Sequence, residues 1–264
     1  ASAAGMRAMT SSSSPGISLK QEGISYLVGA ELPAVIVNMM RGGPGLGTIQ
    51  PGQADYFQAT RSPGHGDGRM IVLAPAGIQE AVDLTQEAFD LADRYRTPVM
   101  LLADGMIGQM MEPIEWRERT EKPRVEKPWA VTGRTGDHQT HIVTSLRLES
   151  ADNERFVYSL EEKYRLIQEQ ETRHEETGCQ GADIILCAFG TTARIALSAI
   201  KALEAEGIRA GLYRPITLWP FPGARLAELA GQDSVKAVLT VEMSLGQMVE
   251  DVRLAVLGKK PTPF

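Results

Sequence analysis

The feature that most constrains the fold is a strand–helix–strand pattern in the first half of the chain. Two short apolar runs, Met70–Leu73 and Pro98–Ala103, enclose a segment, Ile78–Arg96, whose apolar side chains recur at helical spacing. Elements joined in this order by short connections form a βαβ unit, and such a unit implies a parallel sheet. The apolar, β-branched run Ala34–Asn38 predicts a further buried strand.

The same pattern returns in the second half of the chain. Strands are predicted at Ile184–Ala188, around Gly211–Tyr213 and at Val235–Val241. A helix is predicted from Gly190 through Ala205, with Gly207 in the position that often ends a helix. Two regions of this kind predict an α/β fold with two domains.

A segment rich in proline and charge separates the two regions. Residues 112–136 have this composition, which is typical of a connector that runs over the surface. A helix is predicted after it, over Glu154–Glu176, with one apolar stripe. We therefore expect a first domain at residues 1–111, a connector with one helix at 112–178, and a second domain at 179–264.

Composition excludes several classes of function. The chain has 264 residues, a net charge of −6 and no basic stripe, so nucleic-acid binding is not expected. Its two cysteines, Cys179 and Cys187, cannot supply all the thiolates of an iron–sulfur cluster or an all-cysteine zinc site. So few cysteines are typical of a reducing, cytoplasmic compartment. No apolar run approaches the roughly 18 residues of a membrane span, and the N-terminus does not resemble a signal peptide.

The sharpest candidate for chemistry is NMMRGGPGLG, residues 38–47, which follows a predicted strand. Ligands of open parallel sheets bind beyond the carboxyl ends of the strands, and glycines there let the backbone approach a ligand closely. Arg41 at this place can grip a carboxylate or phosphate through two parallel hydrogen bonds. The alternative is a surface arginine paired with an acidic side chain, and spacing alone does not decide between the two.

The serine run Ser11–Ser14 is a weaker candidate. It follows a predicted short strand, Met6–Thr10, and precedes a helix, so its backbone amides are placed to face a ligand. The bare pattern favours a simple turn at a helix N-terminus instead.

Two other patterns carry less weight. Gly66-Asp67-Gly68 resembles the start of the diphosphate and magnesium motif of thiamine enzymes. The Asn-Asn pair that should follow is absent from the helical region Phe89–Arg96. Asp137, His138 and His141 carry metal-ligating groups, but they lie in a predicted loop without a frame to hold them, and a solvated loop is the favoured interpretation.

Several long strings resemble one family closely. MTSSSSPGISLKQEGISYL, LPAVIVNMMRGGPGLGTIQPGQADYFQA and GHGDG are similar to the alpha-type subunit of 2-oxoacid:ferredoxin oxidoreductases. Within the family, these strings are most similar to the 3-methyl-2-oxobutanoate (2-ketoisovalerate) branch. In the second half, AFGTTARIALSAIKALEAEGIRAGLYRPITLWPFP and VEMSLGQMVEDVRLAV resemble that subunit's transketolase-C-like domain. The resemblance covers nearly the whole chain.

The resemblance implies a fold and a set of cofactors. The first domain would be the pyrimidine-binding domain of a thiamine diphosphate enzyme, and the second a transketolase C-terminal-like domain. A separate beta subunit would hold the diphosphate and Mg²⁺. Gamma and ferredoxin-like delta subunits would complete the complex, with iron–sulfur clusters in a partner, and ferredoxin and coenzyme A would take part in the reaction. An oligomer in the cytoplasm is therefore expected.

The resemblance also assigns residues. Arg41 falls where the family binds the carboxylate of the 2-oxoacid. The serine loop would line the aminopyrimidine pocket, through Ser12, Ser13, Ser14, Pro15 and Gly16. Further candidates for the pocket are Gly42, Gly43, His65 and Asp67.

The chain departs from the family at both ends. A Tyr-Pro-Ile-Thr-Pro segment, whose threonine contacts substrate, and the glutamate that activates the aminopyrimidine are expected upstream of Ala1. A strand rich in Tyr, Gly and Arg is expected after Phe264. From this we expect a chain truncated at both ends and inactive alone.

Three functions stay open at this point. The first is a subunit of a complex that oxidatively decarboxylates a branched-chain 2-oxoacid to its acyl-coenzyme A. The second is the corresponding subunit for 2-oxoglutarate or pyruvate. The third is a truncated, inactive module that only binds a partner.

Overall fold

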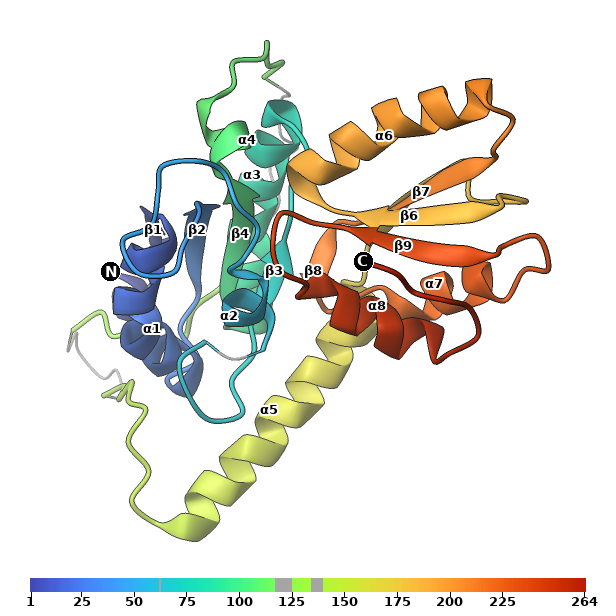
Figure 1. Ribbon diagram of the computed structural model, residues 1–264. Coiled ribbons are helices and arrows are strands. Elements are labelled where there is room, and N and C mark those ends of the chain that lie inside the picture. The colour runs from blue at the N-terminus through green and yellow to red at the C-terminus, as the bar shows by residue number, and fades with distance from the viewer. Residues whose placement is uncertain (62, 117–124, 134–139) are drawn as a thin grey trace.

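The computed structural model describes residues 1–61, 63–116, 125–133 and 140–264. They form two sheets, each covered by helices on both faces, and the sheets lie beside each other (Figure 1). A short 3-10 helix, η1 (Ser2–Ala4), precedes the first sheet. The two-domain α/β fold predicted from the sequence is present.

The first sheet has the order β1-β2-β4-β3-β8. Its strands are β1 (Met9–Ser12), β2 (Ala34–Met40), β4 (Pro98–Asp104), β3 (Ile71–Leu73) and β8 (Thr217–Trp219). The first four are parallel, and β8 pairs antiparallel with β3. All four parallel strands therefore end at one edge, which we call the carboxyl edge.

Side chains alternate between the two faces of this sheet. Ile36 and Met100 pack with α1 (Ser14–Gly29), whereas Val35 and Val99 pack with α3 (Ile78–Tyr95). This alternation explains why β2 and β4 are apolar at nearly every position, because both faces are covered. Two short helices, α2 (Tyr56–Thr60) and α4 (Gly105–Gln109), follow the loops at the carboxyl edge.

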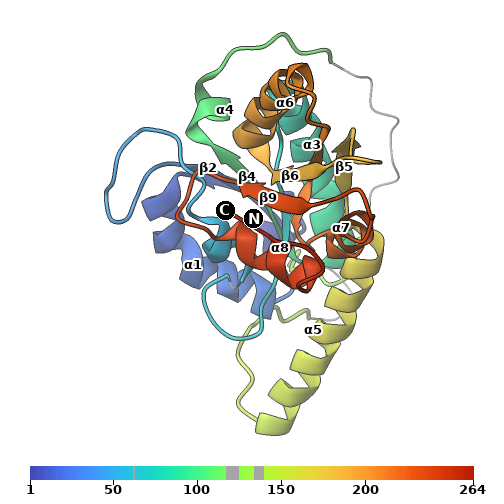
Figure 2. The same ribbon diagram turned by 45° about the vertical axis from the view of Figure 1, so that its right-hand side comes forward.

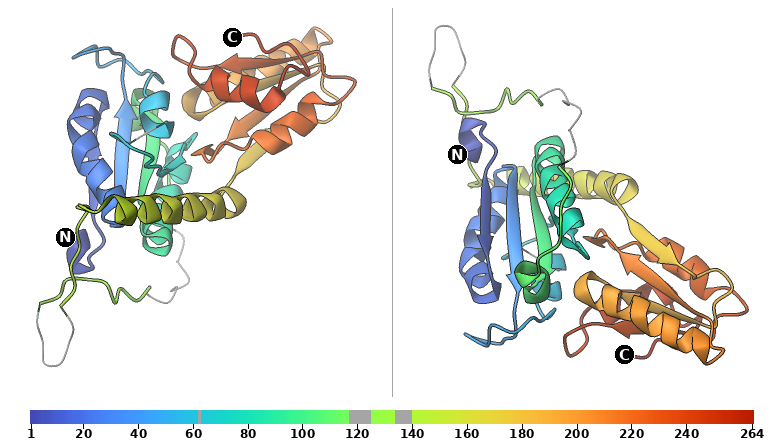
Figure 3. Two further views of the ribbon diagram at one scale, coloured as in Figure 1. Left: turned by 90° about the horizontal axis from the view of Figure 1, so that it is seen from below. Right: turned by 90° about the horizontal axis from the view of Figure 1, so that it is seen from above.

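The second sheet has the order β5-β7-β6-β9. Its strands are β5 (His174–Thr177), β7 (Ala210–Pro215), β6 (Ile184–Ala188) and β9 (Ala237–Val241). Helix α6 (Gly190–Ala205) covers one face, and α7 (Gly223–Ala230) and α8 (Met248–Val256) cover the other (Figure 2). Helix α5 (Ser150–Gln170) runs past the amino ends of the first sheet toward the second (Figure 3).

Some element limits differ from the predictions. The predicted helix Glu154–Glu176 begins at Ser150 and ends at Gln170, and His174–Thr177 is strand β5, because pairing with β7 overrides its helical pattern. The predicted strand Met6–Thr10 is shifted to Met9–Ser12, where the serines pair in register with β2.

The sheets do not follow the predicted boundaries everywhere. Strand β8 lies within the predicted second domain, yet it completes the first sheet, while β5 lies within the predicted connector and belongs to the second. Only Ile216 separates β7 from β8, so one extended run of chain supplies a strand to each sheet. The backbone N–H of Ala74 donates to the carbonyl of Ile216 at 2.8 Å, which fixes the crossing point.

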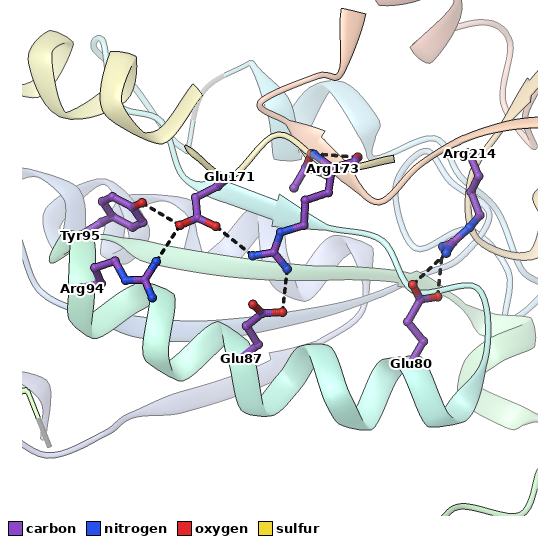
Figure 4. Close-up of polar contacts among 8 residues, drawn as sticks. Glu80, Glu87, Arg94, Tyr95, Glu171, Arg173 and Arg214 are labelled. Carbon is purple, nitrogen blue, oxygen red and sulfur yellow. Dashed lines mark hydrogen bonds and ion pairs between the residues drawn. The ribbon is translucent and has the colours of Figure 1, made fainter. Parts of the chain in front are cut away.

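A row of ion pairs, which we call the α3 ladder, joins the two halves along one side of α3 (Figure 4). Glu80, Glu87 and Arg94 recur at every seventh position and share one face of the helix. Their partners are Arg214 at 2.9 Å, Arg173 at 2.7 Å and Glu171 at 3.0 Å. Arg214 lies in β7, and the other two lie between α5 and β5.

No helix among the described residues is both long enough and apolar enough to cross a membrane.

Candidate functional site

The carboxyl edge brings the two main candidate segments together. Ser12 pairs in register with Asn38, so the serine loop after β1 and the Arg41 loop after β2 leave the sheet side by side. Met40 pairs in register with Asp104, so the end of β4 lies next to Arg41 on the other side.

A hydrogen-bond network locks the serine loop to Arg41. The Ser14 hydroxyl donates to Asp55 Oδ2 at 2.6 Å and accepts from the backbone N–H of Arg41 at 3.0 Å. Asn38, which is fully buried, donates to the same Asp55 oxygen at 2.9 Å and accepts from the Ser14 N–H at 3.1 Å. Each of these polar groups has a partner in a partly buried network, so the network fixes the two loops relative to each other.

The Arg41 side chain keeps binding capacity. One Nη donates to the carbonyl of Leu46 at 3.1 Å, within its own loop. Its Nε is buried without a hydrogen-bond partner, and no carboxylate of the described residues pairs with the guanidinium. The surface ion pair that was the alternative interpretation is therefore not formed with any described residue.

The serine loop differs from a simple anion site at a helix N-terminus. Ser13 occupies the position before α1, but its side chain makes no capping bond. The N–H of Ser14 is bound by Asn38, the N–H of Gly16 donates to Ser13 at 2.8 Å, and Pro15 has no N–H. A Cβ on Gly16 would lie 1.9 Å from the Ser12 hydroxyl, so a side chain at position 16 would displace that hydroxyl. The groups left for a ligand are the hydroxyls of Ser12 and Ser13, which bond to no described residue.

Gly42 and Gly43 open the loop that carries Arg41. The N–H of Gly42 donates to the carbonyl of Gln50 at 2.9 Å, and Arg41 and Pro51 form an antiparallel bridge. The loop between them is exposed from Gly43 to Gln50. It is thus a projecting loop with a closed base.

His65 and Asp67 lie elsewhere. They are exposed in the loop that precedes β3, near the amino ends of the strands, where Gly64 packs against Gln21 and Ser25 of α1. The structure does not bring them together with Arg41 or the serine loop. Of the histidine cluster noted in the sequence, Asp137 and His138 lie outside the described residues. Within the described ranges no three His, Cys, Asp or Glu side chains are grouped to hold a metal ion.

The second half meets the carboxyl edge through buried polar side chains, which we call the strand-end contact: Gln53, Asp104, Thr191 and Thr192. Asp104 accepts from the Thr191 hydroxyl at 2.8 Å and from the N–H groups of Met106 and Ile107, at the start of α4. All four side chains are at most 6% exposed. Hydrogen bonds to a buried carboxylate are stronger than neutral ones, so this contact ties α4 and α6 to the edge.

A second buried contact anchors the segment after the Arg41 loop. The Tyr56 hydroxyl donates to Asp251 of α8 at 2.6 Å, and Arg61 pairs with the other oxygen at 2.9 Å. Burial raises the pKa of Tyr56 well above its ordinary value, and the nearby Asp251 carboxylate raises it further. Tyr56 therefore stays a protonated donor at neutral pH.

The cysteines are not candidates for nucleophilic chemistry. Burial raises the pKa of the Cys179 thiol to about 11, and that of Cys187, which is fully buried, rises further for the same reason. A thiol that stays protonated at neutral pH is a poor nucleophile.

The sequence pattern did not predict a role for Asn38, Gln53 or Asp55. Asn38 carried a signal, because a polar residue inside an apolar strand needs a buried partner. Asp55 and Gln53 carried none, since they stand in a short polar loop and their partners are distant in the sequence.

Two family comparisons cover the chain. The family described as pyruvate flavodoxin/ferredoxin oxidoreductase, thiamine diphosphate-binding, matches residues 1–177. The pyruvate:ferredoxin oxidoreductase core domain II matches residues 182–264.

Individual proteins agree with this result. Ketoisovalerate oxidoreductase subunit VorB of Methanothermobacter marburgensis is 52% identical over 255 residues, which are 97% of this chain and 72% of that subunit. A solved 2-oxoglutarate:ferredoxin oxidoreductase from Magnetococcus marinus, with 2-oxoglutarate, coenzyme A and succinyl-CoA bound, matches with a TM-score of 0.77 at 24% identity. The match covers 100% of this chain and 50% of that one.

The transketolase-like part of the predicted fold is also confirmed. A split-gene transketolase, described as an inactive beta4 tetramer, shares the fold with a TM-score of 0.58 at 19% identity, over 99% of this chain and 67% of that one. Together the family matches and the 52% identity to VorB decide the assignment. The chain belongs to the pyruvate flavodoxin/ferredoxin oxidoreductase family and is a subunit of a 2-oxoacid:ferredoxin oxidoreductase.

Proposed function

We propose that this chain forms one wall of the active site in a complex that oxidatively decarboxylates a branched-chain 2-oxoacid. Arg41 binds the substrate carboxylate, and the serine loop, through Ser12 to Gly16, lines the aminopyrimidine pocket of thiamine diphosphate. The products are an acyl-coenzyme A, CO₂ and two electrons, which pass to ferredoxin.

The observation that carries this proposal is the network through Ser14. Its hydroxyl joins the backbone of Arg41 to Asp55, and its N–H joins the serine loop to Asn38. A substrate carboxylate and the cofactor must be held in a fixed relation for the reaction, and orientation of this kind contributes much of the rate enhancement of enzymes. A shared, partly buried network of hydrogen bonds would supply that relation.

Arg41 has the properties that a carboxylate ligand needs. Its guanidinium has no carboxylate partner among the described residues, and its buried Nε lacks a hydrogen-bond acceptor. The N–H groups of the guanidinium that are not bound within the loop leave capacity for a charge-assisted contact with a carboxylate. The planar guanidinium also fixes the plane of the carboxylate, which an ammonium group does not.

The residues of the serine loop fit a neutral, hydrogen-bonding ring. The hydroxyls of Ser12 and Ser13 are partly exposed and bond to no described residue, whereas the first-turn amides of α1 are already used. Such a surface suits an aminopyrimidine better than a phosphate, which would require free amides. Thiamine diphosphate, when bound, supplies the carbanion chemistry of decarboxylation. The chain's own part is to orient the ring and the substrate and to exclude water.

Partner subunits complete the site. A beta subunit holds the diphosphate and Mg²⁺, and gamma and delta subunits with iron–sulfur clusters carry electrons to ferredoxin. Large apolar side chains at the carboxyl edge support a partner there: Leu46 is 82% exposed, Ile49 74% and Leu245 101%. Their two loops share a base, because the Gln53 N–H donates to the carbonyl of Met243 at 2.8 Å.

The choice of a branched-chain substrate rests on similarity. VorB, at 52% identity, is named for ketoisovalerate, the same compound as 3-methyl-2-oxobutanoate. The neighbour that binds 2-oxoglutarate is 24% identical, and its likeness supports the fold alone.

The test is a substrate panel on the full-length complex. The chain is produced with its partner subunits, and 3-methyl-2-oxobutanoate, pyruvate and 2-oxoglutarate are compared for coenzyme A-dependent reduction of a viologen dye. We expect the highest kcat/KM for the branched substrate. A higher kcat/KM for 2-oxoglutarate or pyruvate would overturn the substrate assignment, and no activity with any 2-oxoacid would favour a binding module instead.

Arg41 variants of the same complex test the site. Arg41→Ala should lower kcat/KM by about 30- to 1000-fold, because both the charge and the two-point contact are lost. Arg41→Lys keeps the charge and should fall between Arg41→Ala and the parent. Thermal midpoints should barely change, since a loop arginine is not part of the core. Parent-like kinetics in Arg41→Ala would remove Arg41 from the site.

A further inference from the structure

Gln53 is a buried glutamine whose side-chain nitrogen and oxygen both bond to the second half of the molecule. It is 0% exposed. Its Nε2 donates to the carbonyl of Phe189 at 2.9 Å, and its Oε1 accepts from the N–H of Met243 at 3.0 Å. The Thr192 hydroxyl lies 3.2 Å from the same Oε1 and shares its single proton between this oxygen and the carbonyl of Phe189 at 2.8 Å. Its backbone N–H donates to Met243 as well, so the residue is held from both sides.

Gln53 lies at the base of the Arg41 loop. Pro51, two positions before it, forms the bridge with Arg41 that closes the loop. Between them, a Cβ on Gly52 would lie 3.2 Å from the carbonyl carbon of Arg41 and from the nitrogen of Gly42. The backbones of the two loop ends are therefore in direct contact, and a displacement of Gln53 moves Arg41 with it.

Arg41 has few anchors of its own. Among the described residues its side chain makes one hydrogen bond, to the carbonyl of Leu46 in the same loop, and its backbone N–H is held by Ser14. The direction of the guanidinium consequently depends on where the loop base is held. One side of that base is fixed by the Ser14 network and the other by Gln53.

We propose that Gln53 is a positioning residue, which aligns Arg41 by fastening its loop to the second domain. This inference rests on the proposed function, because it takes Arg41 as the carboxylate ligand. It makes substrate binding in the first domain dependent on the packing of the second, through the carbonyl of Phe189, the N–H of Met243 and the hydroxyl of Thr192.

Gly190 indicates how closely the second domain is fitted to this glutamine. It has a left-handed φ of 57°, and a Cβ there would lie 3.2 Å from Gln53 Nε2 and 3.3 Å from Asp104 Oδ2. The left-handed backbone conformation favours glycine, and a Cβ would press on both of these side chains.

The first test measures the anchor without any ligand. Gln53→Met keeps the length of the side chain and removes its hydrogen bonds. Thr192→Val removes, with almost no change of shape, the hydroxyl that lies against both Gln53 Oε1 and the carbonyl of Phe189. Thr240→Val is the matched control, because the Thr240 hydroxyl is buried in the second sheet without a partner among the described residues. Amide hydrogen exchange is followed at Gly42 and Thr48, whose N–H groups close the loop by donating to Gln50 and Gly42.

We expect exchange at these two amides to rise about tenfold in Gln53→Met, by less in Thr192→Val, and not at all in Thr240→Val. Unchanged exchange in both variants of the contact would overturn the anchor. If Gln53→Met does not fold, Thr192→Val alone decides between the same two outcomes.

The second test separates positioning from general stability. In the complete complex, Gln53→Met should lower kcat/KM for the 2-oxoacid roughly tenfold in the parent, and less than about twofold in the Arg41→Ala background. Equal losses in both backgrounds would mean a purely structural role and would overturn the inference. The proposed function fails on a different result, namely parent-like kinetics in Arg41→Ala, and the exchange test still applies in that case.

Discussion

Two of the contacts between the halves of the molecule differ in their chemistry. The strand-end contact consists of a glutamine, two threonines and one carboxylate, all at most 6% exposed and bound to one another or to the backbone. The α3 ladder consists of ion pairs whose exposure varies along the helix. Arg214 is 7% exposed as a residue, while the side chains of Glu87 and Arg173 are 34% and 29% exposed.

Because the two contacts differ in burial, their hydrogen bonds and ion pairs should contribute differently to the free energy of unfolding. A buried polar group that loses its partner costs about 1–3 kcal/mol, whereas an exposed ion pair contributes about 0.2–1 kcal/mol and is screened by salt. The strand-end contact should therefore set the relative position of the domains, and the α3 ladder should adjust stability in a graded manner. Of these two contacts, the strand-end contact is the one that adjoins the Arg41 loop, through Gln53.

The largest effect is expected for Asp104→Ala. The carboxylate serves the N–H groups at the start of α4 and the hydroxyl of Thr191 at once. Its removal should lower the free energy of unfolding by about 3 kcal/mol, measured by denaturant titration. Asp152→Ala, an exposed acid in the first turn of α5, is the control and should change it by less than about 0.5 kcal/mol. Equal losses in the two variants would contradict the distinction between the contacts.

The buried end of the ladder comes next. The Arg214 guanidinium bonds both oxygens of Glu80, at 2.9 and 3.0 Å, and donates to Glu175 at 2.7 Å. Arg214→Met should lower the free energy of unfolding by about 2 kcal/mol, because a two-point, charge-assisted contact is lost with little exposure to water. If Arg214→Met lowered the free energy of unfolding by no more than the loss of an exposed ion pair, burial would not determine how much each pair of the ladder contributes.

The middle of the ladder should matter less. Glu87→Gln removes the charge that pairs with Arg173 and should cost about 0.5 kcal/mol at low ionic strength. The cost should shrink further at 1 M salt, where screening is strong. The same salt step should leave the cost of Asp104→Ala unchanged, so the two variants measured together sharpen the comparison. A salt-independent cost for Glu87→Gln would place that pair with the buried contacts.

The smallest expected effect is on the stability of the protein at acidic pH. Arg194 and the N–H of Ile78 hold the pKa of Glu112 below its ordinary value of 4.5. A carboxylate whose pKa is lowered by folding stabilises the protein above the unfolded pKa, and the contribution is lost as the pH falls below it. Glu112→Gln should therefore reduce the loss of stability between about pH 5 and pH 3, measured as thermal midpoint against pH. Glu115→Gln, its exposed neighbour, is the control, and an identical acid profile in both would contradict the assignment.

The sequence predicted the strands and helices whose patterns are local. Ala34–Met40 and Pro98–Asp104 are apolar on both faces, and Ile78–Tyr95 has one clear apolar stripe, so their types follow from periodicity. Strand β8 was missed because its three residues continue β7 and only their distant pairing with β3 separates them. The end of the predicted helix near Glu176 was wrong for a similar reason, since pairing with β7 decides the conformation there.

The candidate site also has parts that a local sequence pattern predicts and parts that it does not. Arg41 and the serine loop were found because each follows a strand, and the parallel register explains why they meet. The network that joins them was not predictable, because Ser14, Asn38 and Asp55 come from three separate segments. The placement of His65 and Asp67 at the opposite edge depends on the path of a loop, which no local pattern specifies.

The passage of one run of chain from β7 into β8 limits how a gene for such a protein can be divided. A cut between residues 177 and 182, where the two matched families adjoin, leaves the first piece without β8. The edge of β3 would then be open, and unpaired strand edges recruit other chains into aggregates. The two pieces would have to be made together, with the second completing the sheet of the first. The two regions that match separate family models therefore depend on each other for folding.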